Sequence, residues 1–276
     1  MSISAKDVKQ LRDLTGAGMM DCKRALQDSG GDLDAAIDLL RKKGQQVAAK
    51  RAEREALQGL IVTRIDDSQQ TGIIVEVNCE TDFVARNDEF VLFTNSVADV
   101  ILNCQPSTLD DLLALPLNHG RTVMETITDL TGKIGEKLQV RRFFTLSSEG
   151  GQVIDYIHPG DRLGVLVSLT GQGDLSSTGR DIAMQVAALN PIAAQRNDVP
   201  QEIQDKEFEI GRESARMEGK PEQILDRIAQ GKLERFFKDN VLVEQPFVKD
   251  ASQRVREVLK AAGADVKGFV RCALGE

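Results

Sequence analysis

Two glycine-bearing stretches are the first candidates for chemistry, because glycine-rich loops bind phosphate groups through their backbone amides. TGAGMMD (15–21) begins like such a loop, but it follows a predicted helix instead of a strand and lacks a third glycine. TGQGDLSSTG (170–179) is also an incomplete match to the phosphate-loop pattern. Both stretches are therefore predicted to be turns, and neither predicts a nucleotide site.

Cysteine and histidine side chains could act as nucleophiles, bases or metal ligands, but their spacing does not favour any of these roles. The cysteines are far apart and form no C-x-x-C pair, which is typical of small buried hydrophobic residues or spare thiols. His158 stands alone in IHPGDR (157–162), at the tip of a predicted hairpin, without an acidic or cysteine neighbour suited to a dyad. His119 has no cluster around it either. The cysteines are Cys22, Cys79, Cys104 and Cys272.

Sequence motifs of common enzymes are also missing from the chain. It contains no G-x-S-x-G, no H-E-x-x-H and no G-x-x-x-x-G-K-[ST]. The sequence therefore predicts no catalytic residue, no metal site and no cofactor, and it favours a binding or interaction protein over an enzyme.

NCETDFVARND (78–88) places an aromatic residue where a strand should end. The apolar run TGIIVEV (71–77) predicts a strand. Phe83 comes a few residues later, next to Asp82 and among polar residues. Aromatic residues make up only 4% of the chain, so an aromatic residue at a strand exit needs an explanation. The residues alone leave two hypotheses open: Phe83 packs over the edge of its own sheet, or it is presented to a partner.

The charge and the terminal sequence limit the classes of partner. A net charge of -8 argues against a broad nucleic-acid-binding surface and favours a partner with basic patches. The N-terminus, MSISAKDVKQLRDLTG, has no apolar core and does not resemble a signal peptide. No apolar run approaches the length of a membrane span. We expect a cytoplasmic protein with neither a nucleic acid nor a membrane as its partner.

The first 54 residues predict a bundle of three short helices. Ser4 and Asp7 form a capping-box-like start, and Gly16 and Gly44 are expected to end the first and third helices. The segment QQVAAKRAERE (45–55) is polar and predicts a helical extension or linker whose basic residues form a solvated face. The apolar positions expected for the first two helices are Val8, Leu11, Leu14, Met20, Cys22, Ala25 and Leu26.

The remaining chain predicts a duplicated α+β core, in halves 55–150 and 151–276. Each half has the order hairpin, helix, insertion, helix and strand, and GIIVEVN (72–78) occupies the place of GVLVSLT (164–170). Each half is predicted to form a small antiparallel three-stranded sheet with helices covering one face.

The insertion in the second half, at about 201–239, predicts a helical hairpin. Gly219, Lys220 and Pro221 separate its two helical segments, and the second segment carries an apolar stripe. The simpler hypothesis is that this stripe packs only on its partner helix. The alternative is an oligomer or partner surface, which would give a homodimer or a 2:2 complex.

Several of these stretches resemble the bacterial elongation factor Ts family. TGAGMMDCKRAL (15–26) and VNCETDFVARND (77–88) resemble its signature segments most closely, and GDLDAAIDLLRKKG, KIGEKLQVRR, HPGDRLGVLV, QPFV and GFVRCALGE follow in the family's order. The resemblance covers nearly the whole chain. It implies a ubiquitin-associated-like three-helix N-terminal domain, a two-part α+β core and a helical-hairpin insertion.

The resemblance also implies a function that composition and spacing do not show. It implies a guanine nucleotide exchange factor for the translational GTPase elongation factor Tu, with Mg²⁺ and GDP or GTP belonging to that partner. In the family, the T-D-F-V segment enters the GTPase domain beside the magnesium and phosphate site, which here means Thr81, Asp82, Phe83 and Val84.

Two further contacts with the partner follow from the same resemblance. The N-terminal bundle provides another contact with the GTPase domain, for which Met19 and Met20 are candidates, and the second half of the core touches a further domain, for which His158 is a candidate. An adaptor that binds a partner without promoting exchange stays open as an alternative.

Overall fold

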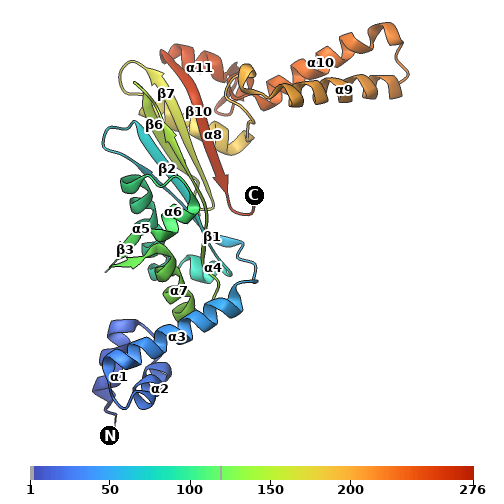
Figure 1. Cartoon of the computed structure of the whole chain (residues 1–276). Helices are drawn as coiled ribbons and strands as arrows, with labels where there is room; N and C mark the ends of the chain where they lie inside the picture. The colour runs from blue at the N-terminus through green and yellow to red at the C-terminus, as the bar shows by residue number, and fades with distance from the viewer. Residues whose placement is uncertain (1–2, 119) are drawn as a thin grey trace. The chain divides into compact units, whose positions relative to one another are not determined.

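The computed structural model describes residues 3–118 and 120–276, and it confirms the predicted α+β class (Figure 1). His119 lies outside the described residues. The chain forms two compact units. Unit 1 contains residues 1–62, 75–143 and 274–276, and unit 2 contains residues 63–74 and 144–273. The domain boundaries predicted above, 1–54, 55–150 and 151–276, stay a prediction about how the chain folds.

The N-terminal bundle in unit 1 consists of α1 (Ala5–Thr15), α2 (Met19–Asp28) and α3 (Leu33–Arg51). The predicted capping box is present: Ser4 accepts from the backbone of Asp7, and Asp7 accepts from the backbone of Ser4. The bundle core is small and apolar, and it consists of Val8, Leu11, Cys22, Ala25, Leu26 and Ala36.

Two residues expected at apolar helix positions are not part of that core. Leu14 is 64% exposed and Met20 is 69% exposed. Both side chains fit the helical apolar pattern but lie outside the core, and the exposure of Met20 is compatible with its expected contact with a partner. A bundle of this size has one small core, and the helical period leaves these two side chains on the outer face.

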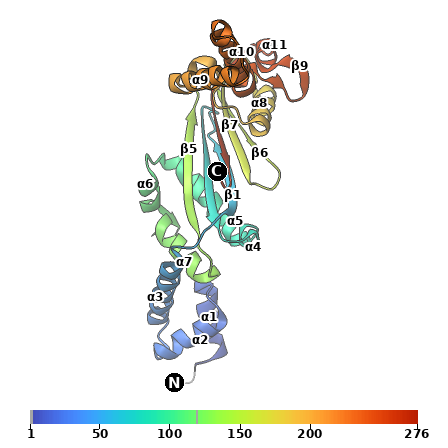
Figure 2. The same cartoon turned by 90° about the vertical axis from the view of Figure 1, so that its right-hand side faces the viewer.

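Helix α3 does not end at Gly44 as the sequence predicted, because the helix continues to Arg51. The reason lies in α7 (Val123–Ile134), which crosses α3 closely (Figure 2). A Cβ built on Gly132 of α7 would lie 2.4 Å from the Cα of Gly44. Gly44 is thus a close-contact glycine inside a helix, and the extension predicted for residues 45–55 is present as far as Arg51.

The first sheet has the strand order β1-β2-β5, with β1 at Gln58–Ile65, β2 at Thr71–Cys79 and β5 at Gln139–Ser147. The turn between β1 and β2 lies where DDSQQ (66–70) predicted it. Helix α5 (Asp88–Cys104) buries Phe90, Phe93, Val97 and Ile101. The smaller elements of this region are α4 (Asp82–Ala85), α6 (Leu109–Ala114), β3 (Pro116–Asn118) and β4 (Arg121–Thr122).

The second sheet repeats this arrangement. Its order is β10-β7-β6, with β6 at Gln152–Ile157, β7 at Leu163–Gly171 and β10 at Ala264–Ala273, and both neighbouring pairs are antiparallel. In each sheet the second strand of the hairpin is central and the last strand lies on its other side. Helices α8 (Ser176–Leu189) and α11 (Val255–Ala261) lie between β7 and β10 in the chain, as α5 and α7 lie between β2 and β5. The predicted duplication is therefore confirmed in strand order.

The predicted helical hairpin is formed by α9 (Gln201–Met217) and α10 (Glu222–Asn240), which run side by side and project from unit 2 (Figure 1). The α10 stripe buries Leu225, Leu233 and Phe237. A Cβ on Gly211 of α9 would lie 3.2 Å from the Cα of Ala229, so the helices pack closely. This packing agrees with the simpler hypothesis for the stripe. The homodimer or 2:2 complex stays a prediction.

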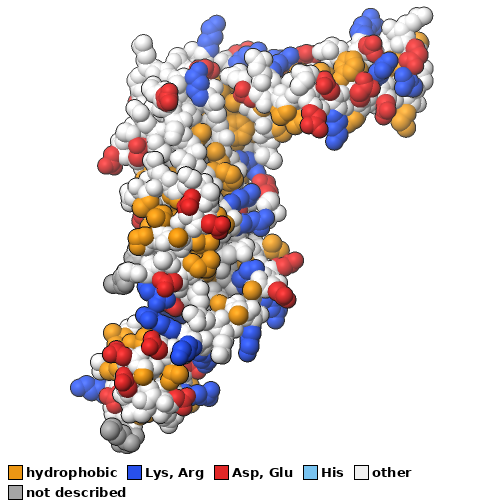
Figure 3. Space-filling model, viewed as in Figure 1, with side chains coloured by type: hydrophobic (Ala, Val, Ile, Leu, Met, Phe, Trp, Pro, Cys, Tyr) orange, Lys and Arg blue, Asp and Glu red, His pale blue; other side chains and the backbone are white. Residues whose placement is uncertain are grey.

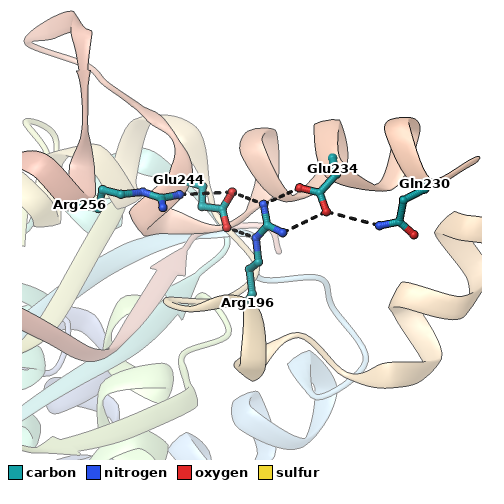
Figure 4. Close-up of polar contacts among 5 residues, drawn as sticks. All are labelled: Arg196, Gln230, Glu234, Glu244 and Arg256. Carbon is teal, nitrogen blue, oxygen red and sulfur yellow. Dashed lines mark hydrogen bonds and ion pairs between the residues drawn. The ribbon is translucent and has the colours of Figure 1, made fainter. Parts of the chain in front are cut away.

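An ion-pair network fastens the base of the hairpin to the rest of unit 2 (Figure 4). Arg196, in the short helix η1 (Arg196–Asp198), contacts the carboxylate of Glu234 on α10 at 2.8 and 3.1 Å. It also contacts Glu244 in η2 (Leu242–Glu244), and Arg256 reaches the same carboxylate at 3.4 Å. The short strands β8 (Pro246–Phe247) and β9 (Asp250–Arg254) follow.

Candidate partner-binding site

The segment Thr81–Val84 does not extend strand β2 but turns into the one-turn helix α4. Thr81 is its N-cap: the hydroxyl oxygen accepts from the backbone N–H of Val84 at 3.4 Å. Threonine favours this position because its side chain satisfies an amide that the helix leaves unpaired. Phe83 is thereby placed in the middle of a single helical turn.

Phe83 is 82% exposed, although it is a large apolar residue. Ala85, two residues later, is buried and faces the protein. Asp82 and Val84 are half-buried. The hypothesis that Phe83 packs over its own sheet edge is therefore wrong, since its ring is left in solvent.

Glu136, just beyond the end of α7, holds the start of α4. The backbone N–H and the hydroxyl of Thr81 donate to its two carboxylate oxygens at 3.0 and 2.8 Å. Hydrogen bonds to an ionised acceptor are stronger than neutral ones, and two of them fix an orientation. Thr81 is thus attached both to its own helix and to α7.

Glu80 supplies a second attachment immediately before the segment. Arg51, the last residue of α3, donates to both of its carboxylate oxygens at 3.0 and 2.9 Å. The backbone N–H of Lys137 donates to one of the same oxygens at 2.7 Å. Burial alone would raise the pKa of Glu80, but the hydrogen bonds from Lys137 and Arg51 outweigh it and hold that pKa below its usual range.

Cys79, two residues before Thr81, is buried and has a thiol of low reactivity. Its thiol is buried and lies 3.1 Å from the carbonyl oxygen of Thr81. Burial, followed by the charge of Glu136, raises the pKa of the thiol to about 12. A thiol with such a pKa stays protonated near neutrality, so Cys79 serves as a packing residue. Of the other cysteines, Cys22 and Cys272 are buried and Cys104 is exposed.

Asp82 is the charged group next to Phe83. Its carboxylate pairs with Arg86 at 3.1 Å, and the two side chains are 48% and 80% exposed. An exposed pair of this kind contributes little stability, so the carboxylate can exchange Arg86 for another partner at small cost. The segment therefore presents an aromatic ring and a carboxylate side by side.

A second apolar surface lies on the bundle, in the same compact unit. Met19 is 59% exposed at the start of α2, where Met20 is also exposed, and Leu14 is exposed near the end of α1. Figure 3 shows hydrophobic side chains among charged ones on the visible face of the bundle. We call Leu14, Met19 and Met20 the bundle surface.

His158 belongs to unit 2, so the structure does not group it with Thr81–Val84. It is exposed in the turn between β6 and β7, where its Nδ1 lies 2.9 Å from the hydroxyl of Tyr156. Its ring also meets the Tyr156 ring edge-on, with centroids 6.0 Å apart. This neighbour orients the imidazole but supplies no acid or nucleophile.

The sequence did not identify the residues that hold α4 in place. Arg51, Glu80 and Glu136 were not singled out, because they are far apart in the chain and carry no spacing signal. Within residues 3–118 and 120–276, no three His, Cys, Asp or Glu side chains are grouped so as to hold a metal ion. No helix in the same part of the chain is long and apolar enough to cross a membrane.

Comparison with known proteins gives a consistent result. A family model described as "Elongation factor TS" matches residues 80–276. The chain is 46% identical to elongation factor Ts of Chlorobium phaeobacteroides over 284 aligned positions, covering 99% of both chains. It is 48% identical to that of Amoebophilus asiaticus, with 100% of both chains covered, and 47% identical to that of Cytophaga hutchinsonii, with 99% covered.

Proposed function

The chain belongs to the elongation factor Ts family of translation elongation factors, and we propose that it promotes GDP release from the GTPase elongation factor Tu. It changes no covalent bond in this role and is not an enzyme in the chemical sense. It needs no cofactor of its own, since Mg²⁺ and the nucleotide belong to the GTPase.

Exchange is a matter of linked binding equilibria. The factor must bind the nucleotide-free GTPase better than the loaded one, because a ligand shifts an equilibrium only by its differential affinity. Linkage then requires nucleotide to weaken binding of the factor as much as the factor weakens binding of nucleotide. The factor therefore has to disturb what holds the nucleotide, namely the phosphate-binding amides and the Mg²⁺ that bridges the phosphates.

Phe83 carries the proposal. Its ring is 82% exposed on a helix that two carboxylates hold in place. An aromatic ring can bury about 150 Å² or more, and a rigid aromatic residue is the usual centre of an interface. We propose that Phe83 enters an apolar pocket of the GTPase domain and displaces a helix that supports the Mg²⁺ site. Because α4 is already formed, little conformational entropy is lost on binding.

Thr81, Asp82 and Val84 have separate parts in this proposal. Thr81 caps and anchors α4, and Val84 is half-buried beside Phe83. Asp82 leaves Arg86 and hydrogen-bonds backbone or basic groups of the GTPase, or competes for the surroundings of the metal. None of these residues has to bind Mg²⁺ in the free protein.

Further contacts are proposed away from α4. The bundle surface gives a second contact with the GTPase domain, and its exposed methionines suit that role because methionine adapts to irregular apolar surfaces. His158 is a candidate contact with another domain of the partner. Action in the cytoplasm, without direct binding to nucleic acid, stays a prediction.

The test is release of a fluorescent GDP from purified elongation factor Tu, chased with excess unlabelled GDP, with and without this protein. Acceleration supports exchange. Binding to the GTPase without acceleration would favour the adaptor hypothesis instead. Asp82→Ala, run beside the parent, is expected to slow release by about tenfold or less, since one exposed charged contact is lost.

A further inference from the structure

Helix α3 runs between the bundle, which carries the bundle surface, and the segment that presents Phe83. Its first half packs in the bundle, where Ala36 is buried with Leu11 and Leu26. Its last residue, Arg51, binds Glu80 next to the segment that presents Phe83. A single helix thus connects the bundle to the residue that precedes Thr81, the N-cap of α4.

The position of α3 is set by its crossing with α7. The Cβ that Gly132 lacks would lie 2.4 Å from the Cα of Gly44 and 3.3 Å from its carbonyl carbon. These are backbone atoms, which cannot rotate away as the end of a side chain can. The two helices therefore touch backbone to backbone at this point.

The space available for a Cβ atom differs between the two glycines of the crossing. A Cβ on Gly44 would lie 3.7 Å from the Cα of Gly132 and 3.9 Å from the carbonyl oxygen of Thr128, which are ordinary contact distances. A methyl group is therefore accommodated on α3 but not on α7. Either glycine-to-alanine change favours the helix by about 1 kcal/mol, so the two variants differ mainly in steric fit.

Ion pairs and hydrogen bonds near the crossing attach α3 and α7 to their neighbours and link the segments that follow them. Lys43 of α3 pairs with Asp21 of α2, and Lys133 of α7 pairs with Glu89 of α5. The ammonium group of Lys137, just after α7, donates to the carbonyl oxygens of Ala52 and Arg54 at 2.8 and 2.9 Å. The chain that leaves α3 is thus bound to the chain that leaves α7.

We infer that the crossing of α3 and α7 at Gly44 and Gly132 is a positioning joint that sets Phe83 and the bundle surface at one fixed separation. Gly132 and Arg51 are the positioning residues. In this inference they do not contact the GTPase but act through α4, which Arg51, Glu136 and Lys137 hold from the two sides of the joint. The inference rests on the proposed function, in which both surfaces meet the same GTPase.

A fixed separation matters because two contacts on one rigid body reinforce each other. Once the first contact forms, the second has a high effective concentration, but only if the geometry allows both at once. Gly132→Ala must push α3 away by roughly an ångström to bring 2.4 Å up to an ordinary 3.4 Å contact. Both surfaces would survive this change, but they could no longer engage together in the best geometry.

The kinetic test measures GDP release against factor concentration for the parent, Gly132→Ala and the matched control Gly44→Ala, each with and without Met20→Ala. Met20→Ala is expected to raise the half-saturating concentration about tenfold in the parent and in Gly44→Ala. In Gly132→Ala the same change is expected to have little effect, because the bundle contact is already lost. An equal Met20→Ala effect in all three backgrounds would overturn the inference.

A second measurement tests the joint without the GTPase. Spin labels are attached through Met20→Cys and Phe83→Cys in a Cys104→Ser background, since Cys104 is the exposed native thiol. The label-to-label distance distribution is expected to be narrow and unchanged by Gly44→Ala, and shifted or broadened by Gly132→Ala. An unchanged distribution in Gly132→Ala would overturn the joint, whereas absence of exchange by the parent would overturn only the proposed function.

Arg51→Gln provides the same test if Gly132→Ala fails to fold. This change removes the hydrogen bonds from Arg51 to the Glu80 carboxylate at the end of α3 but leaves the helix crossing intact. It is expected to broaden the distance distribution, and Arg51→Lys, which retains the charge, is expected to restore part of the parent behaviour. Distributions identical to the parent in both variants would remove Arg51 from the joint.

Discussion

Thr81 and Glu136 are joined by two hydrogen bonds although they lie 55 residues apart: the backbone N–H and the hydroxyl of Thr81 donate to the carboxylate at 3.0 and 2.8 Å. This contact explains how a one-turn helix can carry an exposed aromatic ring in a defined place. A four-residue helix has no intrinsic stability in water, so its order must come from tertiary contacts.

Removal of this contact is expected to loosen α4. Glu136→Ala leaves two donors of Thr81 without their acceptor, which costs about 1–3 kcal/mol of unfolding free energy. It is also expected to slow GDP release by about tenfold, because Phe83 is no longer held in place. Urea unfolding and the release assay check the two effects. Glu136→Gln, which retains one carbonyl oxygen, is the control and should fall between the two proteins; full exchange activity in Glu136→Ala would contradict this account of α4.

Truncation of Phe83 should leave folding nearly unchanged. With its ring in solvent, Phe83→Ala is expected to alter the unfolding free energy by less than about 0.5 kcal/mol. Phe90→Ala is the contrast, since Phe90 is fully buried on α5 and its truncation should cost about 3–5 kcal/mol. Urea unfolding measures the free energy of unfolding of both variants and of the parent. A loss of several kcal/mol on Phe83→Ala would mean that the ring packs inside the protein.

The thiols are expected to react in an order set by burial. Cys104 is exposed and should react with a thiol reagent at pH 8 within minutes, whereas Cys79, with its pKa raised to about 12 by burial, should react only on unfolding. Mass spectrometry of the modified peptides identifies the sites. Fast modification of Cys79 in the native protein would show that α4 opens readily.

The Arg196 network gives the hairpin base a dependence on pH. The hydrogen bonds from Arg196 hold the pKa of Glu244 and of Glu234 below the usual value of 4.5. A carboxyl group whose pKa is depressed in the folded state stabilises that state above its unfolded pKa, and the stabilisation is lost as the pH falls through the folded pKa. The network should therefore contribute fully near pH 7 and weaken below about pH 4.5.

Arg196→Gln tests this dependence. It leaves the carboxylate of Glu244, which is 3% exposed, with Arg256 as its ion-pair partner among the described residues. A loss of about 2–3 kcal/mol is expected at pH 7, below the range for fully buried pairs because Arg196 itself is 38% exposed. The difference between variant and parent should shrink in acid, as measured by urea unfolding at pH 7 and at about pH 3.5. A difference that is the same at both pH values would contradict the network.

The helices and sheets could largely be predicted because their signals are local. Neighbouring residues predict the capping box of Ser4 and Asp7, the turn at DDSQQ and the repeated hairpin-to-strand order. The structure contains all three. Gly44 shows the limit of this approach. A glycine in a helical pattern predicts an end, but here Gly132, from a distant part of the chain, determines its role.

The site could be predicted only in part. Phe83 was conspicuous because an aromatic residue among polar ones follows an apolar strand, and its exposure agrees with presentation to a partner. Its anchors were not predictable, since a hydrogen bond between residues 55 apart leaves no pattern in the sequence. Leu14 and Met20 stand at apolar helix positions but lie outside the core, because periodicity alone does not say which apolar side chains a small core can accommodate.

The most direct test of the account compares two exposed apolar side chains in one assay. Leu92, on the adjacent helix α5, is 68% exposed and has no part in the proposed contact, so Leu92→Ala is the matched control for Phe83→Ala. The rate of fluorescent GDP release from elongation factor Tu is measured with each folded variant and with the parent. The account predicts full activity in Leu92→Ala and a loss of about tenfold or more in Phe83→Ala. Release as fast with Phe83→Ala as with the parent would contradict it.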